Sequence, residues 1–318
     1  MHPFIKSPLN YTGNKFRILP QIIPEIPKDI DTMVDLFCGG ATVGANIQCE
    51  KVIFIDNNER IIELLEYLAN CRDSNNLIVN LHRLADKYNL TCSGLNGYAY
   101  YREMLKDKTT NNGLKEINSD GFYILREDYN KLSSKSSSKA FQMLYLLMVY
   151  SFNNDIRFSS VGNYNLPIGK TDLNNNNIKK LKEFVEKMEN KKALFICEDF
   201  DSKKTKDYIN EADFIYLDPP YLLGTAVYNE SSKWNNETEY RLLGLLDEIL
   251  ESNKPFMLSN ILKNSKGYNE PLAYWLNLHK DKVRYKHIDY HYKSASYNKK
   301  NRKLNEQEII AMGGYSND

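Results

Sequence analysis

The sequence predicts an α/β fold in which a Rossmann-like sheet of mostly parallel strands carries a mostly helical insert. Short apolar runs bounded by turn residues, which are typical of buried parallel strands, occur in two regions of the chain. Between these regions the apolar residues follow helical spacing with polar interruptions. We therefore expect residues 1–71 and 186–318 to form one domain and residues 72–185 to form a second, helical domain.

Each predicted element follows from a local pattern. The predicted strands are short and apolar and comprise residues 32–37, 52–56, 193–197, 214–217 and 255–260. Helical spacing over residues 41–48 and 59–70 gives a β-α-β-α start, and a further helix is expected over residues 237–252. Near the end of the chain, segments 285–292 and 307–312 are expected to pair as antiparallel strands.

The composition limits the class of protein. With 318 residues, 42% of them hydrophobic, the chain can build a sizeable core, and its net charge of +1 means that any nucleic-acid partner needs locally gathered positive charge. The five scattered cysteines contain no Cys-x-x-Cys and fit reduced thiols rather than a disulfide framework. The start lacks a signal peptide's apolar core, and the apolar run 140–152 is too short to span a bilayer. We expect a cytoplasmic protein without a membrane partner, in which this run is a buried helix.

A glycine-containing turn, Asp35–Gly44, follows the first predicted strand and opens a helix. Glycines here allow a sharp turn and close approach to a ligand, although their spacing is not the Gly-x-Gly-x-x-Gly of dinucleotide enzymes. Taken alone, the turn fits an ordinary strand–helix connection as well as a nucleotide site. Asp56, at the end of the next strand, is placed to accept from ribose hydroxyls. Asp35 can hold the ammonium of a methionine moiety, which NAD lacks.

The tetrapeptide Asp218, Pro219, Pro220 and Tyr221 stands just beyond a predicted strand, where ligands bind in open α/β sheets. An exocyclic amine of a base is a poor nucleophile because its lone pair is delocalised into the ring. Asp218 and the Pro219 carbonyl can each accept one amine hydrogen and aim the lone pair at a sulfonium methyl. The two prolines fix the backbone, and Tyr221 offers a face on which an extruded base stacks. The tetrapeptide thus predicts methylation of an amino nitrogen.

These residues resemble the Dam-like, alpha-group DNA adenine-N6 methyltransferases, notably those of T-even phages. The resemblance runs along nearly the whole chain, in the alpha-group order of glycine motif, recognition region and catalytic tetrapeptide. The matching segments are residues 6–15, 34–40, 125–131, 151–158, 162–167 and 256–260, together with the tetrapeptide. The resemblance implies a catalytic, AdoMet-binding methyltransferase domain over residues 1–71 and 186–318, and a target-recognition domain over residues 72–185.

The resemblance also implies the residues that contact the cofactor. It places Tyr11 and Lys15 at the AdoMet end of the pocket, and Phe200 against the cofactor adenine with Asp199 beside it. The full cofactor-binding set that it implies is Tyr11, Lys15, Asp35, Phe37, Gly39, Gly40, Asp56, Asp199, Phe200 and Asp218. The catalytic set is Asp218, Pro219, Pro220 and Tyr221, with Asp218, Pro219 and Tyr221 holding the flipped adenine.

For the recognition region, the resemblance implies that Phe152 and Asn153 wedge into duplex DNA and that Arg157 reads a guanine. Asp155 departs from the family pattern, because an apolar residue that touches a thymine methyl usually stands there. A carboxylate can instead accept from a cytosine amino group. Thr171 also departs from the pattern, since the T-even phage enzymes carry an arginine at that position. Both departures argue against a simple GATC target.

A basic segment, 284–304, interleaves tyrosines with Lys293, Lys299 and Arg302 and other cations. We expect it to contact DNA phosphates, and a solvated hairpin tip is the alternative. We expect no metal, because no paired cysteines or glutamates accompany His287 and His291.

The sequence as a whole predicts an AdoMet-dependent enzyme that methylates N6 of a flipped adenine in double-stranded DNA, encoded by a prokaryote or a phage. Amino methylation of cytosine N4 or of RNA remains an alternative, because the tetrapeptide does not choose the ring. A catalytically silent DNA-binding homologue is the alternative from another class. A restriction endonuclease that acts separately is the protein partner we consider.

Overall fold

The computed structural model describes residues 4–11, 13–106, 111–223, 234–288 and 307–315. The chain divides into two compact units. The sheet unit comprises Lys15–Glu59 and Lys191–Asp318, and the helical unit comprises Met1–Asn14 and Arg60–Asn190.

The unit boundaries differ from the expected domain boundaries at two places, the N-terminal segment and helix α3 (Glu59–Ala69), both of which the sequence assigns to the sheet domain. Long-range side-chain contacts tie α3 to α8 (Ser138–Tyr150) within the helical unit. Gln142 Nε2 donates to the Tyr67 hydroxyl at 2.8 Å, and the Tyr67 and Phe141 rings stack with centroids 5.1 Å apart. Local periodicity predicts that α3 is a helix, whereas these contacts decide which unit contains it.

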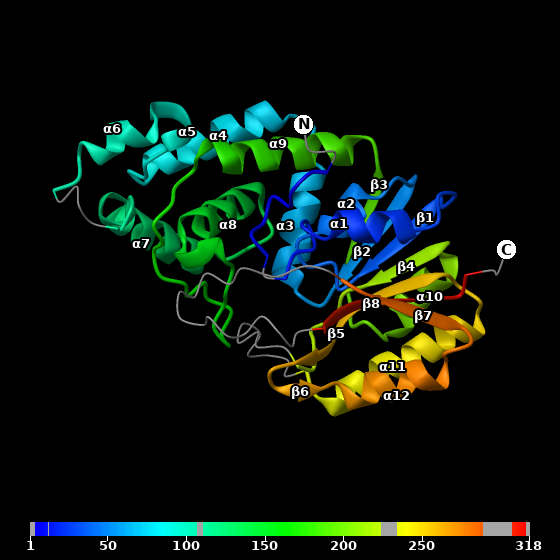
Figure 1. Cartoon of the computed structure of the whole chain (residues 1–318). Coiled ribbons are helices and arrows are strands. Elements are labelled where there is room, and N and C mark those ends of the chain that lie inside the picture. Colours follow the sequence, from blue (N-terminus) through cyan, green and yellow to red (C-terminus); the bar gives the residue numbers. More distant parts are fainter. Residues whose placement is uncertain (1–3, 12, 107–110, 224–233, 289–306, 316–318) are drawn as a thin grey trace. The chain divides into compact units, whose positions relative to one another are not determined.

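The described strands form an eight-stranded sheet in the order β3-β2-β1-β4-β5-β8-β7, with β6 paired to β5 (Figure 1). Neighbours from β3 through β5 are parallel, whereas β8 is antiparallel to both β5 and β7. The strands are β1 (Thr32–Leu36), β2 (Lys51–Asp56), β3 (Lys192–Cys197), β4 (Phe214–Leu217), β5 (Phe256–Asn264), β6 (Gly267–Tyr268), β7 (Val283–His287) and β8 (Gln307–Gly313). The predicted α/β class and the late antiparallel pair are both confirmed.

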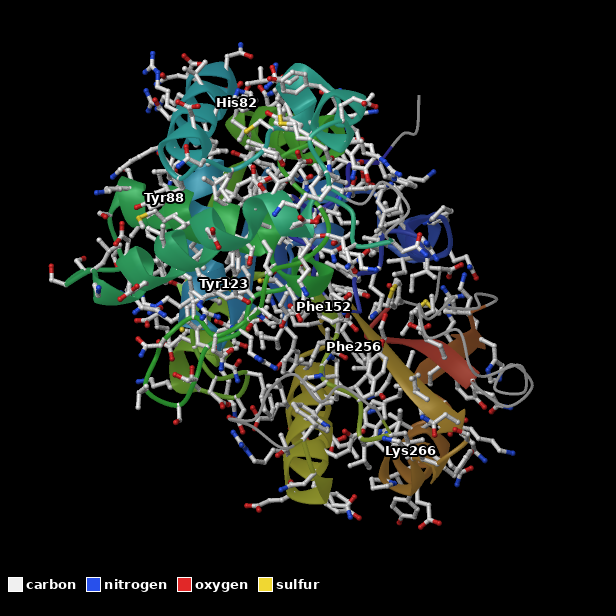
Figure 2. All side chains as sticks on the ribbon, turned by 90° about the vertical axis from the view of Figure 1, so that its left-hand side faces the viewer. His82, Tyr88, Tyr123, Phe152, Phe256 and Lys266 are labelled. Atoms are coloured by element: carbon white, nitrogen blue, oxygen red, sulfur yellow. The ribbon has the colours of Figure 1, made fainter. Side chains whose placement is uncertain are left out.

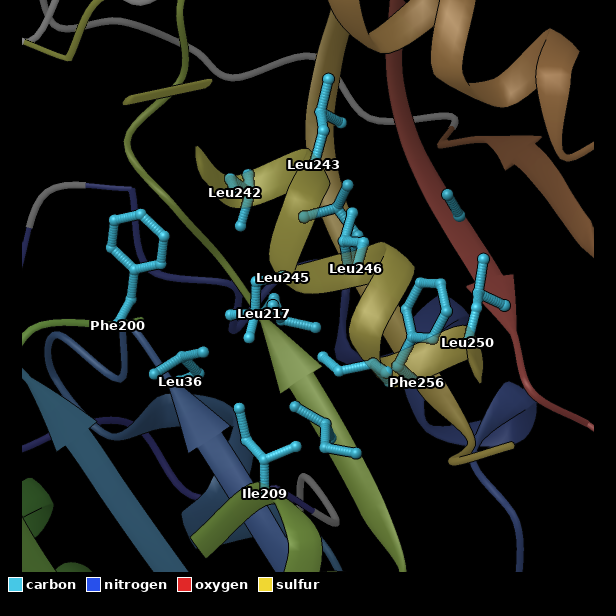
Figure 3. Close-up of a cluster of buried hydrophobic side chains, with 14 of the residues drawn as sticks. Leu36, Phe200, Ile209, Leu217, Leu242, Leu243, Leu245, Leu246, Leu250 and Phe256 are labelled. Atoms are coloured by element: carbon cyan, nitrogen blue, oxygen red, sulfur yellow. The ribbon is translucent and has the colours of Figure 1, made fainter. Parts of the chain in front are cut away.

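One face of the sheet is covered by three helices whose apolar residues form a buried core (Figure 3). Alternate residues of the central strands, such as Leu36 in β1 and Leu217 in β4, enter this core, as do leucines of α11. The covering helices are α10 (Lys203–Glu211), α11 (Asn236–Glu251) and α12 (Glu270–Leu278); the sheet unit also contains α1 (Leu19–Ile22), η1 (Ile23–Glu25) and α2 (Thr42–Asn46). Burial of this apolar face sets the strand register and therefore fixes where each strand ends.

The helical unit is built around α8, in which Ala140 and every residue from Met143 to Tyr150 is buried. A helix that is apolar on all sides belongs in a core, so the buried helix expected at 140–152 is confirmed as far as Tyr150, whereas Phe152 lies beyond the helix and is exposed. Ser137 caps α8 by accepting from the Ala140 N–H at 3.2 Å. The other helices are α3, α4 (Ser74–Lys87), α5 (Ser93–Asn96), α6 (Tyr98–Arg102), α7 (Lys115–Lys131) and α9 (Asn175–Glu189), with η2 (Phe152–Asn154) after α8. Over the described residues, we find no helix with both the length and the apolar character needed to cross a membrane.

Candidate active site and recognition loop

Three aspartates gather at the carboxyl edge of the sheet, where β2, β1 and β4 are parallel neighbours. Asp35 lies near the end of β1, Asp56 ends β2, and Asp218 directly follows β4. The Asp218 N–H donates to the Leu36 carbonyl at 3.2 Å. The fold thus brings the glycine turn and the tetrapeptide together, although they lie far apart in the sequence.

The glycine turn is held by hydrogen bonds from its own amides to these carboxylates. The Gly39 N–H donates to Asp56 Oδ2 at 3.0 Å, and the Gly44 N–H donates to Asp35 Oδ2 at 2.8 Å. A Cβ on Gly44 would lie 2.8 Å from that same oxygen and 2.5 Å from the Phe54 ring, so only glycine fits there. Gly39 has a φ of 47°, a conformation that glycine adopts without strain. The turn therefore orients both carboxylates before any ligand binds.

Burial of these carboxylates disfavours their ionised forms unless a positive charge lies beside them. The pKa of Asp35 is raised to about 8, chiefly by burial; the hydrogen bond from Gly44 lowers it, and the nearby Asp218 and Asp56 carboxylates add to the rise. Burial also raises the pKa of Asp56 above its usual range. A cationic group placed beside Asp35 would favour its ionised form.

Asp218 is the centre of a small polar cluster. Lys15 Nζ lies 2.8 Å from Asp218 Oδ1 and 4.0 Å from Glu308 Oε1, and the Lys15 side chain is only 3% exposed. The Tyr221 hydroxyl donates to Asp218 Oδ1 at 3.1 Å and to Glu308 Oε1 at 3.4 Å. Burial raises the pKa of Asp218, and Lys15 opposes that rise by pairing with the carboxylate. Lys15, whose side chain is expected to contact AdoMet, thus lies against the tetrapeptide.

An aromatic cluster stands next to the glycine turn. The Phe37 and Phe200 rings have centroids 5.2 Å apart, and the Trp234 ring lies 5.7 Å from each of them. The Arg241 guanidinium lies 4.9 Å from the Phe200 centroid and pairs with Asp199 at 2.9 Å. The predicted cofactor residues Phe37, Asp199 and Phe200 therefore lie together in the sheet unit, where the Phe200 ring is buried and packs against Phe37, Trp234 and Arg241.

In the helical unit, the residues predicted to read DNA occupy a reading loop, which we define as Phe152–Arg157. Phe152 is 50% exposed (Figure 2), and Asn153 adopts a left-handed φ of 59°. Burial raises the pKa of Asp155 above its usual value. The Arg157 Nε donates to Asn165 Oδ1 at 2.8 Å, so this hydrogen bond does not use the terminal nitrogens of the guanidinium.

A family model described as D12 class N6 adenine-specific DNA methyltransferase matches residues 11–305 of the chain. The chain belongs to this family. The expected membership of the DNA adenine-N6 methyltransferases is confirmed, whereas the likeness to the T-even phage enzymes stays a prediction.

Curated relatives of this D12 chain include long and short proteins. Type II methyltransferase M.FokI of Planomicrobium okeanokoites is 31% identical over 99% of the chain and 43% of that protein. Modification methylase StsI of Streptococcus sanguinis is 32% identical over 96% of the chain and 42% of that protein. The chain therefore spans less than half the length of these two relatives. The DNA adenine methylase of Escherichia coli (strain K12) is 26% identical over 79% of each chain.

Three residues of the D12 site have no part in the sequence-based prediction. Glu308 of β8 contributes a buried carboxylate next to Asp218, and Trp234 completes the aromatic cluster. The fully buried Glu239 orients that ring by accepting from Trp234 Nε1 at 2.5 Å. A glutamate directly before the apolar residues of β8, Ile309 to Met312, was the available sign for Glu308. For Trp234 and Glu239 we find no local sign, because tertiary contacts create their roles.

Several predicted residues fall elsewhere. Tyr11 belongs to the helical unit, so its contact with the cofactor stays a prediction. The basic residues Lys293, Lys299 and Arg302 lie outside the described residues. In the described part of the basic segment, Lys286 and Arg284 pair with Glu25 at 2.7 and 3.3 Å. Nowhere in the described parts of the chain do three or more His, Cys, Asp or Glu side chains gather to hold a metal ion.

Proposed function

We propose that this chain transfers a methyl group from AdoMet to N6 of an adenine flipped out of double-stranded DNA. The observation that carries the proposal is the position of Asp218 beside Asp35 and Asp56 at one edge of the sheet, in a chain of the D12 family. The carboxylate that would hold the amine and the turn that would hold the cofactor then share one site.

The residues at this edge fit AdoMet. The Asp35 carboxylate suits the ammonium of the methionine part, since burial leaves it in need of a cation. Asp56 suits the ribose hydroxyls, because the amides of Gly39 and Asn58 already hold it in place. The Phe37–Phe200 ring pair suits the adenine ring, which would pack beside it. When bound, AdoMet supplies an electrophilic methyl on its sulfonium sulfur.

The tetrapeptide would prepare the nitrogen that attacks this methyl. Lys15 and Tyr221 both contact Asp218 Oδ1, so we assign Oδ2 to one N6 hydrogen and the Pro219 carbonyl to the other. These two acceptors would draw N6 toward tetrahedral geometry and direct its lone pair at the methyl carbon. The Tyr221 ring would stack on the flipped base. The rate increase would come from positioning and oriented charge, without a covalent enzyme intermediate.

Target recognition would fall to the helical unit. Phe152 and Asn153 would fill the space that the flipped adenine leaves, and the exposure of Phe152 supports this role. Arg157 would pair its terminal nitrogens with guanine O6 and N7, whereas Asp155 would accept from a cytosine amino group. The basic residues Lys293, Lys299 and Arg302 would contact phosphates. A cytoplasmic location and a separately acting restriction endonuclease stay predictions.

The proposal is tested by expressing the chain in a methylation-deficient host and reading modified bases in the host genome by single-molecule sequencing. We expect N6-methyladenine at one sequence motif, and none with Asp218→Ala. N4-methylcytosine in place of N6-methyladenine would favour the cytosine alternative. No modified base from soluble protein that also fails to bind AdoMet in calorimetry would favour the silent DNA-binding homologue.

A further inference from the structure

The reading loop has an unusual backbone. Asn153 and Asn154 are consecutive residues with left-handed φ values of 59° and 54°. Side chains other than glycine rarely adopt this conformation, although asparagine tolerates it better than most. Two such residues in succession persist only when their surroundings hold them.

A clasp of three groups holds this backbone. We define the clasp as the Asn154 side chain, the Thr171 hydroxyl and the Val149 carbonyl. Asn154 Nδ2 donates to Thr171 Oγ1 at 2.7 Å and also to the Val149 carbonyl. The Thr171 hydroxyl in turn donates to the Val149 carbonyl at 3.1 Å. The clasp thus links the end of α8, the reading loop and the segment that leaves the loop.

Main-chain hydrogen bonds also join residues 150–152, at the start of the loop, to residues 167–169. The Phe152 N–H donates to the Pro167 carbonyl at 2.9 Å, and the Gly169 N–H donates to the Tyr150 carbonyl at 2.7 Å. A Cβ on Gly169 would lie 2.2 Å from the Ser151 carbonyl oxygen, so these two segments lie too close together for any residue but glycine at position 169. The loop is therefore anchored at its base by main-chain contacts.

Hydrogen bonds from neighbouring side chains hold the main chain of Asp155. Its carbonyl accepts from Ser151 Oγ and from the Tyr164 hydroxyl, each at 2.9 Å. Its Oδ1 accepts from the Ile156 N–H at 2.8 Å, so we assign Oδ2 to the base edge. The position of this reader is set by contacts inside the protein.

Residues of the segment 91–121 support both neighbours of Thr171. Asp172 is buried, and it accepts from Thr91 Oγ1 at 2.9 Å and from both Ser93 N and Ser93 Oγ at 2.6 Å. Leu114 N donates to the Lys170 carbonyl at 3.1 Å on the other side. Both neighbours of Thr171 are therefore held from this segment.

We propose that Asn154 and Thr171 are positioning residues for target selection, because their clasp presets Phe152 and Asp155 in the geometry that meets DNA. The proposal rests on the function proposed above. Thr171 then acts inside the protein and does not read a base. Its hydroxyl affects specificity by holding the loop in one shape. A loop that sampled other shapes would have to be ordered on binding, and the free-energy cost of that ordering would weaken binding to the correct site.

The clasp is tested with Thr171→Val, which keeps the shape of the side chain and removes the hydroxyl, and with Thr171→Ser, which keeps the hydroxyl. Competition binding to a cognate duplex and to one changed at the base pair read by Asp155 measures discrimination without catalysis. We expect Thr171→Val to lose about tenfold in discrimination, the effect of one hydrogen bond, and Thr171→Ser to retain it. Asn154→Gly, which relieves the backbone but removes the amide, should behave like Thr171→Val.

Two further measurements separate positioning from general destabilisation. AdoMet affinity and the melting temperature should stay near their original values in Thr171→Val, and kcat/KM on the cognate duplex should fall. Unchanged discrimination in both Thr171→Val and Asn154→Gly would overturn the proposal, as would equal losses in Thr171→Val and Thr171→Ser. If the unaltered protein binds its site selectively but methylates nothing, the proposed activity fails while the clasp is still tested by binding.

Discussion

The two units solve different physical problems with their polar groups. In the sheet unit, carboxylates are buried at the strand ends, and burial raises the pKa of Asp35, Asp56 and Asp218. In the helical unit, the reading loop exposes Phe152 and holds its shape through neutral hydrogen bonds such as that from Asn154 to Thr171. Chemistry on an amine needs charge in a desolvated place, whereas selection of a sequence needs groups that reach the solvent side of the protein.

Asp218→Ala tests most directly whether the buried carboxylates of the sheet unit carry the chemistry. We expect kcat to fall about 100- to 1,000-fold, because one oriented acceptor at the reacting nitrogen is lost. AdoMet affinity should change little, and discrimination between duplexes should not change. Steady-state methylation and calorimetry measure the three quantities. A variant that kept its methylation rate would show that Asp218 is not the acceptor.

Asp35→Asn separates cofactor binding from chemistry within the sheet unit. We expect AdoMet affinity to fall about 10- to 100-fold, because a charged hydrogen bond to the ammonium is lost. In the unaltered protein the pKa of Asp35 is about 8, so the free carboxyl is mostly protonated at neutral pH. Binding the ammonium favours the carboxylate, and therefore binding should release a proton and tighten as the pH rises toward 8.

Calorimetry in buffers of different ionisation enthalpy counts the released proton. Asp35→Asn should show no proton release from this site. If the unaltered protein and the variant release the same number of protons, Asp35 does not hold the ammonium.

Asn165→Ala probes the helical unit without touching the predicted readers themselves. Its carboxamide oxygen orients the Arg157 guanidinium through a 2.8 Å hydrogen bond. We expect discrimination at the guanine that Arg157 is proposed to read to fall about three- to tenfold, since one exposed hydrogen bond is removed. Asn165→Asp serves as the matched control, because it keeps the acceptor. Loss of discrimination at every base pair equally would argue for general loosening of the loop.

Lys15→Met removes the cation from the buried cluster around Asp218. Its effect should appear on the acid side of the pH profile of kcat/KM. Burial raises the pKa of Asp218, and Lys15 opposes this rise. Without the lysine the pKa of Asp218 rises further, so the carboxylate form proposed to accept the amine hydrogen is lost at a higher pH as the solution is acidified. The acid limb of the kcat/KM profile should therefore move to higher pH. A limb that stays in place would show that another group controls it.

The sequence predicted every described strand except β6 because short apolar runs mark them, whereas helices α1, α10 and α12 were not predicted. The run Phe214–Leu217 is apolar at every position, and the strand there is buried throughout. The tetrapeptide was predictable because its residue types are those that an amine requires. By contrast, the assignment of α3 to the helical unit depends on contacts of Tyr67 with Phe141 and Gln142, which no local pattern contains.

Local spacing and residue chemistry by themselves determined the α/β class, the glycine turn and the amine-directed tetrapeptide. Tertiary structure alone decided that Glu308 and Lys15 share the Asp218 cluster, that Trp234 completes the aromatic surface, and that Thr171 is spent on the clasp. The physical reason is distance along the chain. Periodicity and turn chemistry act over a few residues, whereas burial and hydrogen bonding join segments that only the folded chain brings together.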